Sequence, residues 1–558
     1  MKPLVPEYDP LEWAQKPFAE RARMACETYA VQGWGSPSAV YLFYGLKLVL
    51  YVGGWWLFCS FTRGMGDLGT IDSWGFSVVA FEKAVLWSLL FEGLGLGCGS
   101  GPLTARYVPP FTAFLHFLRP GTIKRPFDAR LPVLGGYRRT WLDVGLYAAA
   151  QVLLLSALVS GTPARGLLLA ISLLYLVLAL ADKTIFLSAR GEHYWTALTL
   201  FALFSHWLPG AKALWIALWF WAGFSKLTPH FTSVICVMNS NAPFTAPIAR
   251  VRRRFYRNFP DDLRPGRFAD IAHGGAALEF GIPIVMLVAH GGTLTKVGLA
   301  MMVFLHCFIS AQVPAGVPLE WNVMMIYGGF FLFSRHAHTT IFDMPPACGV
   351  FLAVMLVAIP LLGNLFPKRI SFLMAMRYYA GNWPYSVWLF RGESYRKLDA
   401  IKKAAAWVPD QLARFYDRPT AVAVASRTVG WRLMHLQGRA MGDLVPMAVD
   451  RFEDYTWVDG ELVCGMILGY NFGDGHLHDE ELLAAIQEEC GFEDGELRVM
   501  MVEAQPFGRH TCNYRVHDAC TGLMAEGELD VRVLQSRQAW ERSSVDGRAG
   551  LAAVDVTH

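Results

Sequence analysis

Ten apolar segments occupy the first two thirds of the chain, and most are as long as a helix that crosses a bilayer. A bilayer core requires about 20 apolar residues per helix, and lipid leaves backbone groups no hydrogen-bond partners outside the segment, which favours helices. Charged residues make up only 17% of the 558 residues, against about 25% in soluble proteins. We therefore expect an α-helical polytopic membrane domain of about 10 transmembrane helices, at residues 39–60, 76–98, 141–160, 165–181, 194–209, 212–230, 269–290, 295–313, 321–334 and 347–366.

The loops between these segments indicate an orientation. Loop 99–140 carries seven Arg or Lys against one acid, loop 231–268 carries seven Arg against two Asp, and the loop after residue 366 is also basic. If all ten segments cross, these loops lie on one side, which the positive-inside rule assigns to the cytoplasm. We expect a multi-pass protein of the bacterial cytoplasmic (inner) membrane with both termini in the cytoplasm.

The composition divides the chain into three parts. Residues 1–38 form a polar N-terminal segment, 39–391 the transmembrane domain, and 392–558 a small soluble α+β domain. Residues 449–535 hold 19 acids and 5 bases, so this domain has an acidic surface that could bind a protein partner. Alternation predicts strands at Glu461–Leu468, Leu497–Val502 and Leu529–Leu534, and an amphipathic helix at Asp479–Cys490. A net charge of +3 is too small to indicate nucleic acid.

Ionisable residues at bilayer depth are costly and are therefore functional candidates. Ten occur in or beside the apolar segments: Lys47, Glu82, Lys83, Glu92, Asp143, Lys226, Asp270, His273, Glu279 and His306. Depth along the helices brings Lys47 and Glu92 to similar levels near the cytoplasmic face. We expect them to form a structural ion pair, and a functional role is the alternative.

Lys226 has the most informative surroundings. Ala222 and Gly223 lie four and three residues before it on the same helix face, and leave room for a ligand or a close helix. A lysine in apolar surroundings gives up its proton more readily and can act as a base. The alternative is a lysine that extends to the interface beside an aromatic belt. Pro229 disturbs the helix, which weakens a pairing with His230.

No metal site is predicted. His476-Leu-His478-Asp479 lacks further ligands, and Asp479 can cap the following helix instead. None of the ten cysteines forms a Cys-x-x-Cys pair.

The segment Trp219-Phe-Trp-Ala-Gly-Phe-Ser-Lys-Leu227 resembles the aromatic-x-x-Ala-Gly-x-x-Lys-Leu segment of the vitamin K-dependent γ-carboxylase-like (HTTM-type) membrane domain. Leu278–Pro283, His306 and the aromatic run Tyr327–Phe333 follow the order of that domain's Glu…Pro, His and Phe-rich helix. Lipase maturation factors have a similar Ala-Gly-x-x-Lys segment. The whole chain, with Tyr378–Trp383 and its acidic tail, also resembles a bacterial family of uncharacterised transmembrane proteins.

The resemblance implies a catalytic lysine that deprotonates a reduced quinone. Lys226 would then be the proton acceptor, and Glu279 and His306 would line the same cavity. The expected substrate-binding residues are Trp219, Gly223, His230, Asp270 and His273. The chain departs from the family after the lysine, where Thr228-Pro-His-Phe-Thr-Ser-Val234 replaces Trp-x-x-Gly-Tyr, which argues against protein carboxylation.

Three functions remain open. The first is a membrane enzyme that acts on a lipophilic substrate or a quinone, with an intramembrane lysine base. The second is a non-catalytic accessory or maturation factor for lipid-related proteins, which would bind its partner through the acidic domain. The third is a lipid transporter, which is disfavoured because the chain shows no internal repeat. All three imply contact with membrane lipids.

Overall fold

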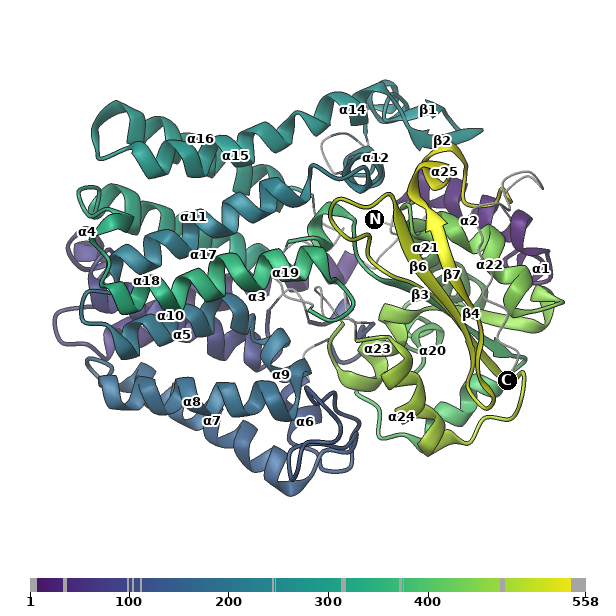
Figure 1. Cartoon of the computed structure of the whole chain (residues 1–558), viewed down its shortest axis with the longest axis horizontal. Helices are drawn as coiled ribbons and strands as arrows, with labels where there is room; N and C mark the ends of the chain where they lie inside the picture. The colour runs from purple at the N-terminus through teal and green to yellow at the C-terminus, as the bar shows by residue number, and fades with distance from the viewer. Residues whose placement is uncertain are drawn as a thin grey trace.

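The computed structural model describes residues 8–33, 38–97, 100–102, 105–110, 113–242, 245, 247–312, 318–370, 374, 376–471 and 477–542. Long helices lie side by side in one half of the molecule, and a twisted β-sheet with shorter helices forms the other half (Figure 1). One buried core fills the helical half, and a second holds the sheet together with the N-terminal helices.

All ten predicted apolar segments form helices. Their bounds are α3 (Ser38–Ser60), α5 (Val78–Gly93), α7 (Trp141–Val159), α8 (Arg165–Ala181), α10 (Gly191–Leu203), α11 (Leu208–Ser225), α14 with α15 (Arg267–His273 and Gly275–Val288), α16 (Gly292–Ser310), α17 with η3 (Leu319–Gly329 and Phe330–Arg335), and α18 with η5 and α19 (Pro346–Ala353, Val354–Ala358 and Ile359–Leu365).

Among the described residues, five helices are long and apolar enough to cross a membrane, or up to six if a bent pair counts as one span. The five are α3, α7, α14–α15, α16 and α18–α19, and the bent pair joins Leu68–Trp74 to α5 at an angle of 103°. Several other helices are short; α10 has 13 residues, about 20 Å at 1.5 Å per residue. By the length and composition of these helices, the chain is a multi-pass membrane protein.

Shorter elements join these helices. In the first half they are η1 (Leu68–Thr70), α4 (Ile71–Trp74), α6 (Ala113–Phe117), α9 (Lys183–Ser188), α12 (His230–Ser240), α13 (Ala249–Arg253), the hairpin β1–β2 (Tyr256–Asn258 and Asp262–Pro265) and η4 (Ile341–Asp343). After residue 376 they are η7 (Tyr378–Ala380), η8 (Ser394–Ala400), α20 (Val408–Leu412), α21 (Arg418–Leu433), η9 (Gly438–Ala440), α22 (Met441–Ala448), η10 (Phe452–Asp454), α23 (Gly460–Leu468), α24 (Glu480–Cys490) and α25 (Val531–Ser536).

The second half contains an antiparallel sheet in the order β4-β3-β5-β6-β7. Its strands are β3 (Tyr385–Arg391), β4 (Tyr455–Asp459), β5 (Leu497–Val502), β6 (Thr511–Asp518) and β7 (Gly522–Asp530). Trp388 of β3 pairs with Val458 on one side and Val499 on the other, so β3 is an inner strand. The sheet therefore starts seven residues before the predicted boundary at residue 392.

Two strand predictions in this half were wrong, although the strand Leu497–Val502 and the helix ending at Cys490 were right. Glu461–Leu468 lies in helix α23, because Asp459 caps its N-terminus and Gly469 ends it at φ +82°. All nine residues of α23 are buried, and a short, wholly buried run has no periodicity that separates helix from strand. Leu529–Leu534 is divided between the end of β7 and α25, where Asp530 is the cap.

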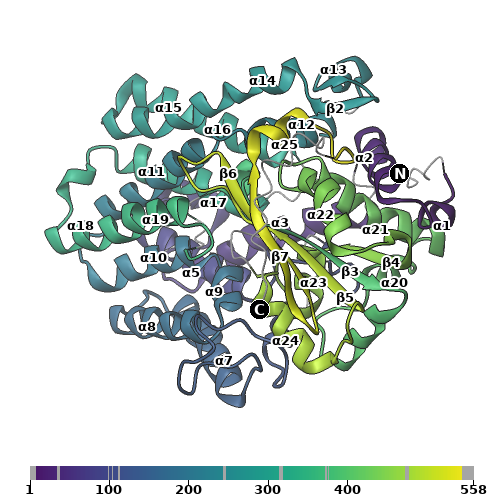
Figure 2. The ribbon, with the colours of Figure 1, turned by 45° about the vertical axis from the view of Figure 1, so that its right-hand side comes forward.

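The N-terminal segment packs on the sheet half. Helix α2 (Phe18–Gln32), which follows α1 (Pro10–Trp13), lies along α21 in both ribbon views (Figures 1 and 2). A Cβ on Gly430 of α21 would lie 2.6 Å from the carbonyl oxygen of Ala25, so the contact requires glycine there. The first and last parts of the chain thus form one body, called here the sheet domain (residues 8–33 and 376–542).

Loops from every helical pair return to the sheet domain. Gln411 accepts a hydrogen bond from Tyr107 N at 2.8 Å, Lys183 lies 4.0 Å from Glu481, and His230 Nε2 is 2.8 Å from Gln505 Oε1. Leu319, after α16, packs against the same core, and Lys368, after α19, lies 3.1 Å from Glu480. Both basic loops therefore lie on the same side of the molecule as the sheet domain.

Arg125 makes the most buried of these contacts. Its guanidinium donates to Asp479 Oδ1 and Oδ2 at 2.6 and 2.9 Å, to Glu481 at 2.5 Å and to the carbonyl of Leu477 at 2.8 Å. The side chain is fully buried. Part of the acidic charge predicted to bind a partner thus faces the chain's own basic loop.

Candidate functional site

A cavity of about 350 Å³ opens among α11, α12, α15 and α16. Its wall is mostly apolar, with Phe231, Leu278 and Phe304 among its residues. Six polar or aromatic residues that bear on its chemistry also line it: Trp219, Lys226, Glu279, His306, Gln312 and Trp321. Four of these were predicted as site residues, so the structure brings the residues of the Lys226 segment, the Glu279 segment and His306 to one cavity.

Lys226 lies where α11 ends. The predicted helix 212–230 stops at Ser225, and Lys226 is its C-cap; Pro229, the N-cap of α12, disfavours a helical conformation just before it. The ammonium group donates to the Glu279 carboxylate of α15, and it lies 5.3 Å from the centre of the Phe231 ring. Only 12% and 4% of the two side chains are exposed. Both charged groups are almost completely removed from water, so each is stabilised mainly by the opposite charge of its partner.

His306 is held at both ring nitrogens. The indole N–H of Trp219 donates to Nε2 at 3.0 Å, and Nδ1 lies 2.8 Å from the Asn322 side-chain oxygen. An indole only donates and an amide oxygen only accepts, so this arrangement selects the neutral tautomer with the proton on Nδ1. In this geometry neither nitrogen is free for a substrate.

Gln312 was not predicted as a site residue, yet its buried side-chain amide lacks hydrogen-bond partners. Its side chain is 5% exposed, and among the described residues neither its amide oxygen nor its nitrogen has a hydrogen-bond partner. A buried amide without partners costs free energy unless something else bonds to it. The cavity therefore offers an apolar wall, an ion pair and a free amide, which together fit a lipophilic molecule with a polar head.

The predicted pair Lys47–Glu92 does not form. Lys47 instead donates to the carbonyls of Gly97 and Ser100 at 2.7 and 2.9 Å. Glu92 accepts from Arg190 at 2.6 Å, and Arg190 also donates to the Tyr379 hydroxyl at 3.1 Å. Arg190 was missed because it lies in a polar stretch between two apolar segments, so no hydropathy argument placed it inside the protein.

The remaining predicted substrate-binding residues lie elsewhere. Gly223 faces the Phe280 ring, which a Cβ would meet at 3.2 Å, so its small size accommodates helix α15 rather than a ligand. His230 is buried against Gln505 of the sheet domain. Asp270 is exposed. His273 is half-buried and its Nε2 lies 2.6 Å from the carbonyl oxygen of Lys226, next to the cavity but outside its lining.

In the part of the chain that the structure describes, no group of three His, Cys, Asp or Glu side chains could hold a metal ion. His476 lies outside that part.

Comparison with known proteins yields one family. A family model described as "Transmembrane protein of unknown function (DUF3556)" matches residues 1–547. No curated protein and no solved structure matches the chain. The similarity to carboxylase-like domains and to lipase maturation factors therefore remains a prediction from the sequence segments quoted above.

Proposed function

Because the chain belongs to this family of transmembrane proteins of unknown function, we propose that it is a multi-pass membrane enzyme that acts on a lipophilic substrate in the cavity beside Lys226. The observation that carries the proposal is the Lys226–Glu279 pair on the wall of a largely apolar cavity. Burying two charges is expensive, and hydrophobic residues of similar volume would often be at least as stable. A role in chemistry is one reason to keep such a pair.

The pair can act as a base. In a nearly dry cavity, transfer of one proton from the ammonium of Lys226 to Glu279 converts two charges into two neutral groups, which removes their desolvation cost. The resulting amine has a free lone pair and can accept a proton from a hydroxyl or an activated C–H of the substrate. Trp219 and Asn322 would hold His306 as a neutral wall residue, whose role is to position neighbours.

The chemistry of the cavity fits a quinone-type head group. The flat apolar rings of such a head would lie against Phe231 and Trp321, and its oxygen atoms would meet the Gln312 amide and the Lys226 amine. A quinol would supply an acidic hydroxyl and two reducing electrons when bound. This part of the proposal rests on the resemblance of Trp219–Leu227 and on the unpartnered amide of Gln312.

We also propose ten crossings, with the sheet domain in the cytoplasm. Each pair of apolar helices ends in a loop that contacts the sheet domain, so an even number of crossings separates successive loops. The strongly basic loops 99–140 and 231–268 favour the cytoplasmic side, and in that orientation both termini are cytoplasmic. A bacterial inner membrane is the setting that the resemblance implies.

The accessory-protein alternative uses the same cavity without chemistry. Its partner would bind the acidic surface of the sheet domain, of which Asp479, Glu480 and Glu481 already pair with Arg125, Arg515, Lys368 and Lys183. Fewer carboxylates then remain for a partner, which favours the enzyme.

The test is mass spectrometry of lipophiles that co-purify with the wild-type protein and with Lys226→Met and Glu279→Gln. Lys212→Met is the matched control, because Lys212 is also a buried lysine of α11 but donates to the carbonyls of His336 and Thr339, away from the cavity. We expect a defined lipophile near one per chain in wild type and Lys212→Met, and a chemically different, unconverted species in Lys226→Met.

Two other outcomes would count against the enzyme. The same lipophile in all four proteins would favour a carrier or accessory role. Bulk phospholipid alone in all of them would mean that the cavity holds no specific ligand.

A further inference from the structure

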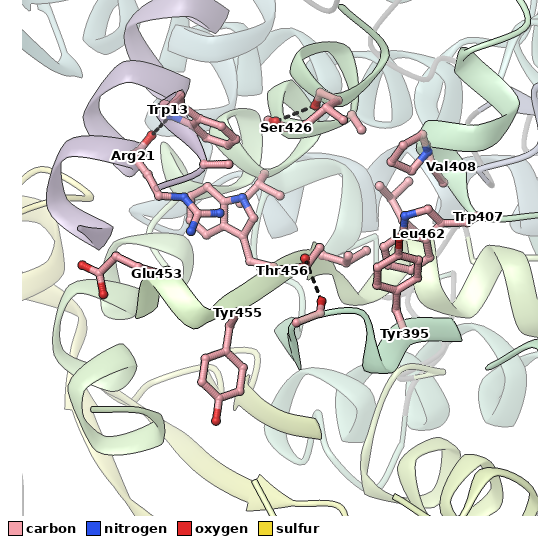
Figure 3. Close-up of a pocket in the computed structure, with 18 of the residues that line it drawn as sticks. Trp13, Arg21, Tyr395, Trp407, Val408, Ser426, Glu453, Tyr455, Thr456 and Leu462 are labelled. Atoms are coloured by element: carbon pink, nitrogen blue, oxygen red, sulfur yellow. Dashed lines mark hydrogen bonds between the residues drawn. The ribbon is translucent and has the colours of Figure 1, made fainter. Parts of the chain in front are cut away.

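A second cavity, of about 300 Å³, lies within the sheet domain. It is formed where the N-terminal helices meet α21, β4 and residues 392–409. Figure 3 shows Trp13, Arg21 and Glu453 on one side of it and Tyr395 and Trp407 on the other. It shares no lining residue with the cavity beside Lys226.

Arg21 is the unusual residue of this wall. The residue is only 2% exposed, and among the described residues its Nε and Nη1 atoms have no hydrogen-bond partner. Its guanidinium lies 5.0 Å from the ring of Trp13, 4.5 Å from Phe452 and 5.2 Å from Trp457. Aromatic rings stabilise a cation through its faces, and they leave its N–H groups, which project in the guanidinium plane, without acceptors.

The other charged groups of the cavity do not supply those acceptors. Glu453 and Asp454 also line the cavity, but neither forms an ion pair with Arg21 within the described residues, and Asp454 lies 3.7 Å from Arg451. Arg418 is already paired with Asp410. Burial lowers the pKa of Arg21 to about 10 and Glu453 partly opposes this, so the side chain remains a cation at neutral pH. An unpaired buried cation is costly, and an anion in the cavity would remove that cost.

We propose that this cavity binds a small organic anion with a flat apolar body, whose carboxylate, sulfonate or phosphate accepts the in-plane N–H groups of Arg21. The body would lie against the aromatic wall of Trp13, Trp457, Tyr395 and Trp407. Planar bidentate pairing with an oxyanion is the interaction for which a guanidinium is suited. The site is independent of the proposed chemistry at Lys226.

The test is equilibrium dialysis of the full-length protein in lipid nanodiscs against two isosteric probes, 2-naphthoate and its neutral amide, 2-naphthamide, with empty nanodiscs subtracted. We expect wild type to bind naphthoate at least ten times more tightly than naphthamide. In Arg21→Met this preference should fall to about one, because the neutral side chain keeps the volume and loses the charge. Arg418→Met is the control and should keep the preference, since Arg418 lines the cavity but is paired.

A second variant covers a failure of Arg21→Met to fold. Ala425→Phe fills the cavity and leaves Arg21 in place, and it should weaken both probes by at least ten-fold. Equal binding of the two probes to wild type, or a preference for naphthoate that persists in Arg21→Met, would overturn the proposal. Lys226→Met should bind naphthoate as wild type does, which distinguishes this site from the cavity beside Lys226.

Discussion

The indole of Trp219 on α11 donates to Nε2 of His306 on α16 at 3.0 Å, and this bond joins two helices that line the cavity beside Lys226. Because Asn322 holds the other ring nitrogen at 2.8 Å, His306 is fixed in position and in tautomer. A histidine held in this way is suited to shaping a cavity rather than to carrying a proton.

We therefore expect His306→Gln to be tolerated. A glutamine amide can accept from Trp219 and donate to Asn322, so bound lipophile should stay within about two-fold of wild type, whereas His306→Ala would leave buried partners unpaired at a cost of about 1–3 kcal/mol each. Lipophile content and thermal unfolding of the two variants give the comparison. Full occupancy of His306→Gln with complete loss of conversion would show instead that the imidazole moves a proton.

Gly223→Leu should loosen the packing of α11 against α15. The Cβ position lies 3.2 Å from the Phe280 ring, so a large side chain would force the helices apart, at a cost of about 1–3 kcal/mol. Gly145→Ala on α7 is the control, since a Cβ there meets nothing within 4 Å and should be neutral or slightly stabilising. Equal melting temperatures for wild type and Gly223→Leu would contradict the close contact.

Arg125→Gln should detach the acidic helix α24 from the membrane half. Removing one partner of a buried ion pair costs about 3–5 kcal/mol, and here two carboxylates lose their main counterion. Faster hydrogen exchange in α24 measures the effect. Asp479→Asn keeps the helix cap and removes the charge. In a double-mutant cycle, the losses of stability from Arg125→Gln and Asp479→Asn should therefore not add. Additive losses would mean that the two residues act separately.

Asp459 should make the stability of the sheet domain pH-dependent. It is fully buried, and burial raises its pKa to about 6, although Arg432 at 3.5 Å opposes the shift. Because the folded state binds the Asp459 proton more tightly than the unfolded state, this carboxyl stabilises the fold below its ordinary pKa of about 3.9. That stability is lost as the pH rises through 6. The effect is of order 2–3 kcal/mol.

Asp459→Asn removes this titration and can still accept the hydrogen bond from Glu461 N that caps α23. The melting temperature of wild type relative to Asp459→Asn should therefore fall between pH 4.5 and pH 7.5. Parallel curves for the two proteins would refute the raised pKa.

Hydropathy predicted the positions of the ten apolar helices and their approximate ends, because a run of apolar residues needs no knowledge of its neighbours. The short motif around Lys226 also predicted two residues of the cavity wall, Trp219 and Lys226. Pairing partners were harder to predict: Glu92 bonds to Arg190, 98 residues away, and only the tertiary packing brings them together. Gln312 carried no motif, and its significance depends on the absence of a partner among the described residues.

The close contact between α2 and α21 has a consequence for synthesis. Phe18–Gln32 leaves the ribosome early, but Arg418–Leu433 follows nearly 400 residues later, after every apolar helix. At about 5–20 residues per second, the interval is on the order of 20–80 s. During that time the aromatic rings of Trp13 and Phe18 lack Trp457 and Phe452, against which they pack in the folded protein. The nascent N-terminus therefore presents these aromatic faces without their final partners until translation is nearly complete.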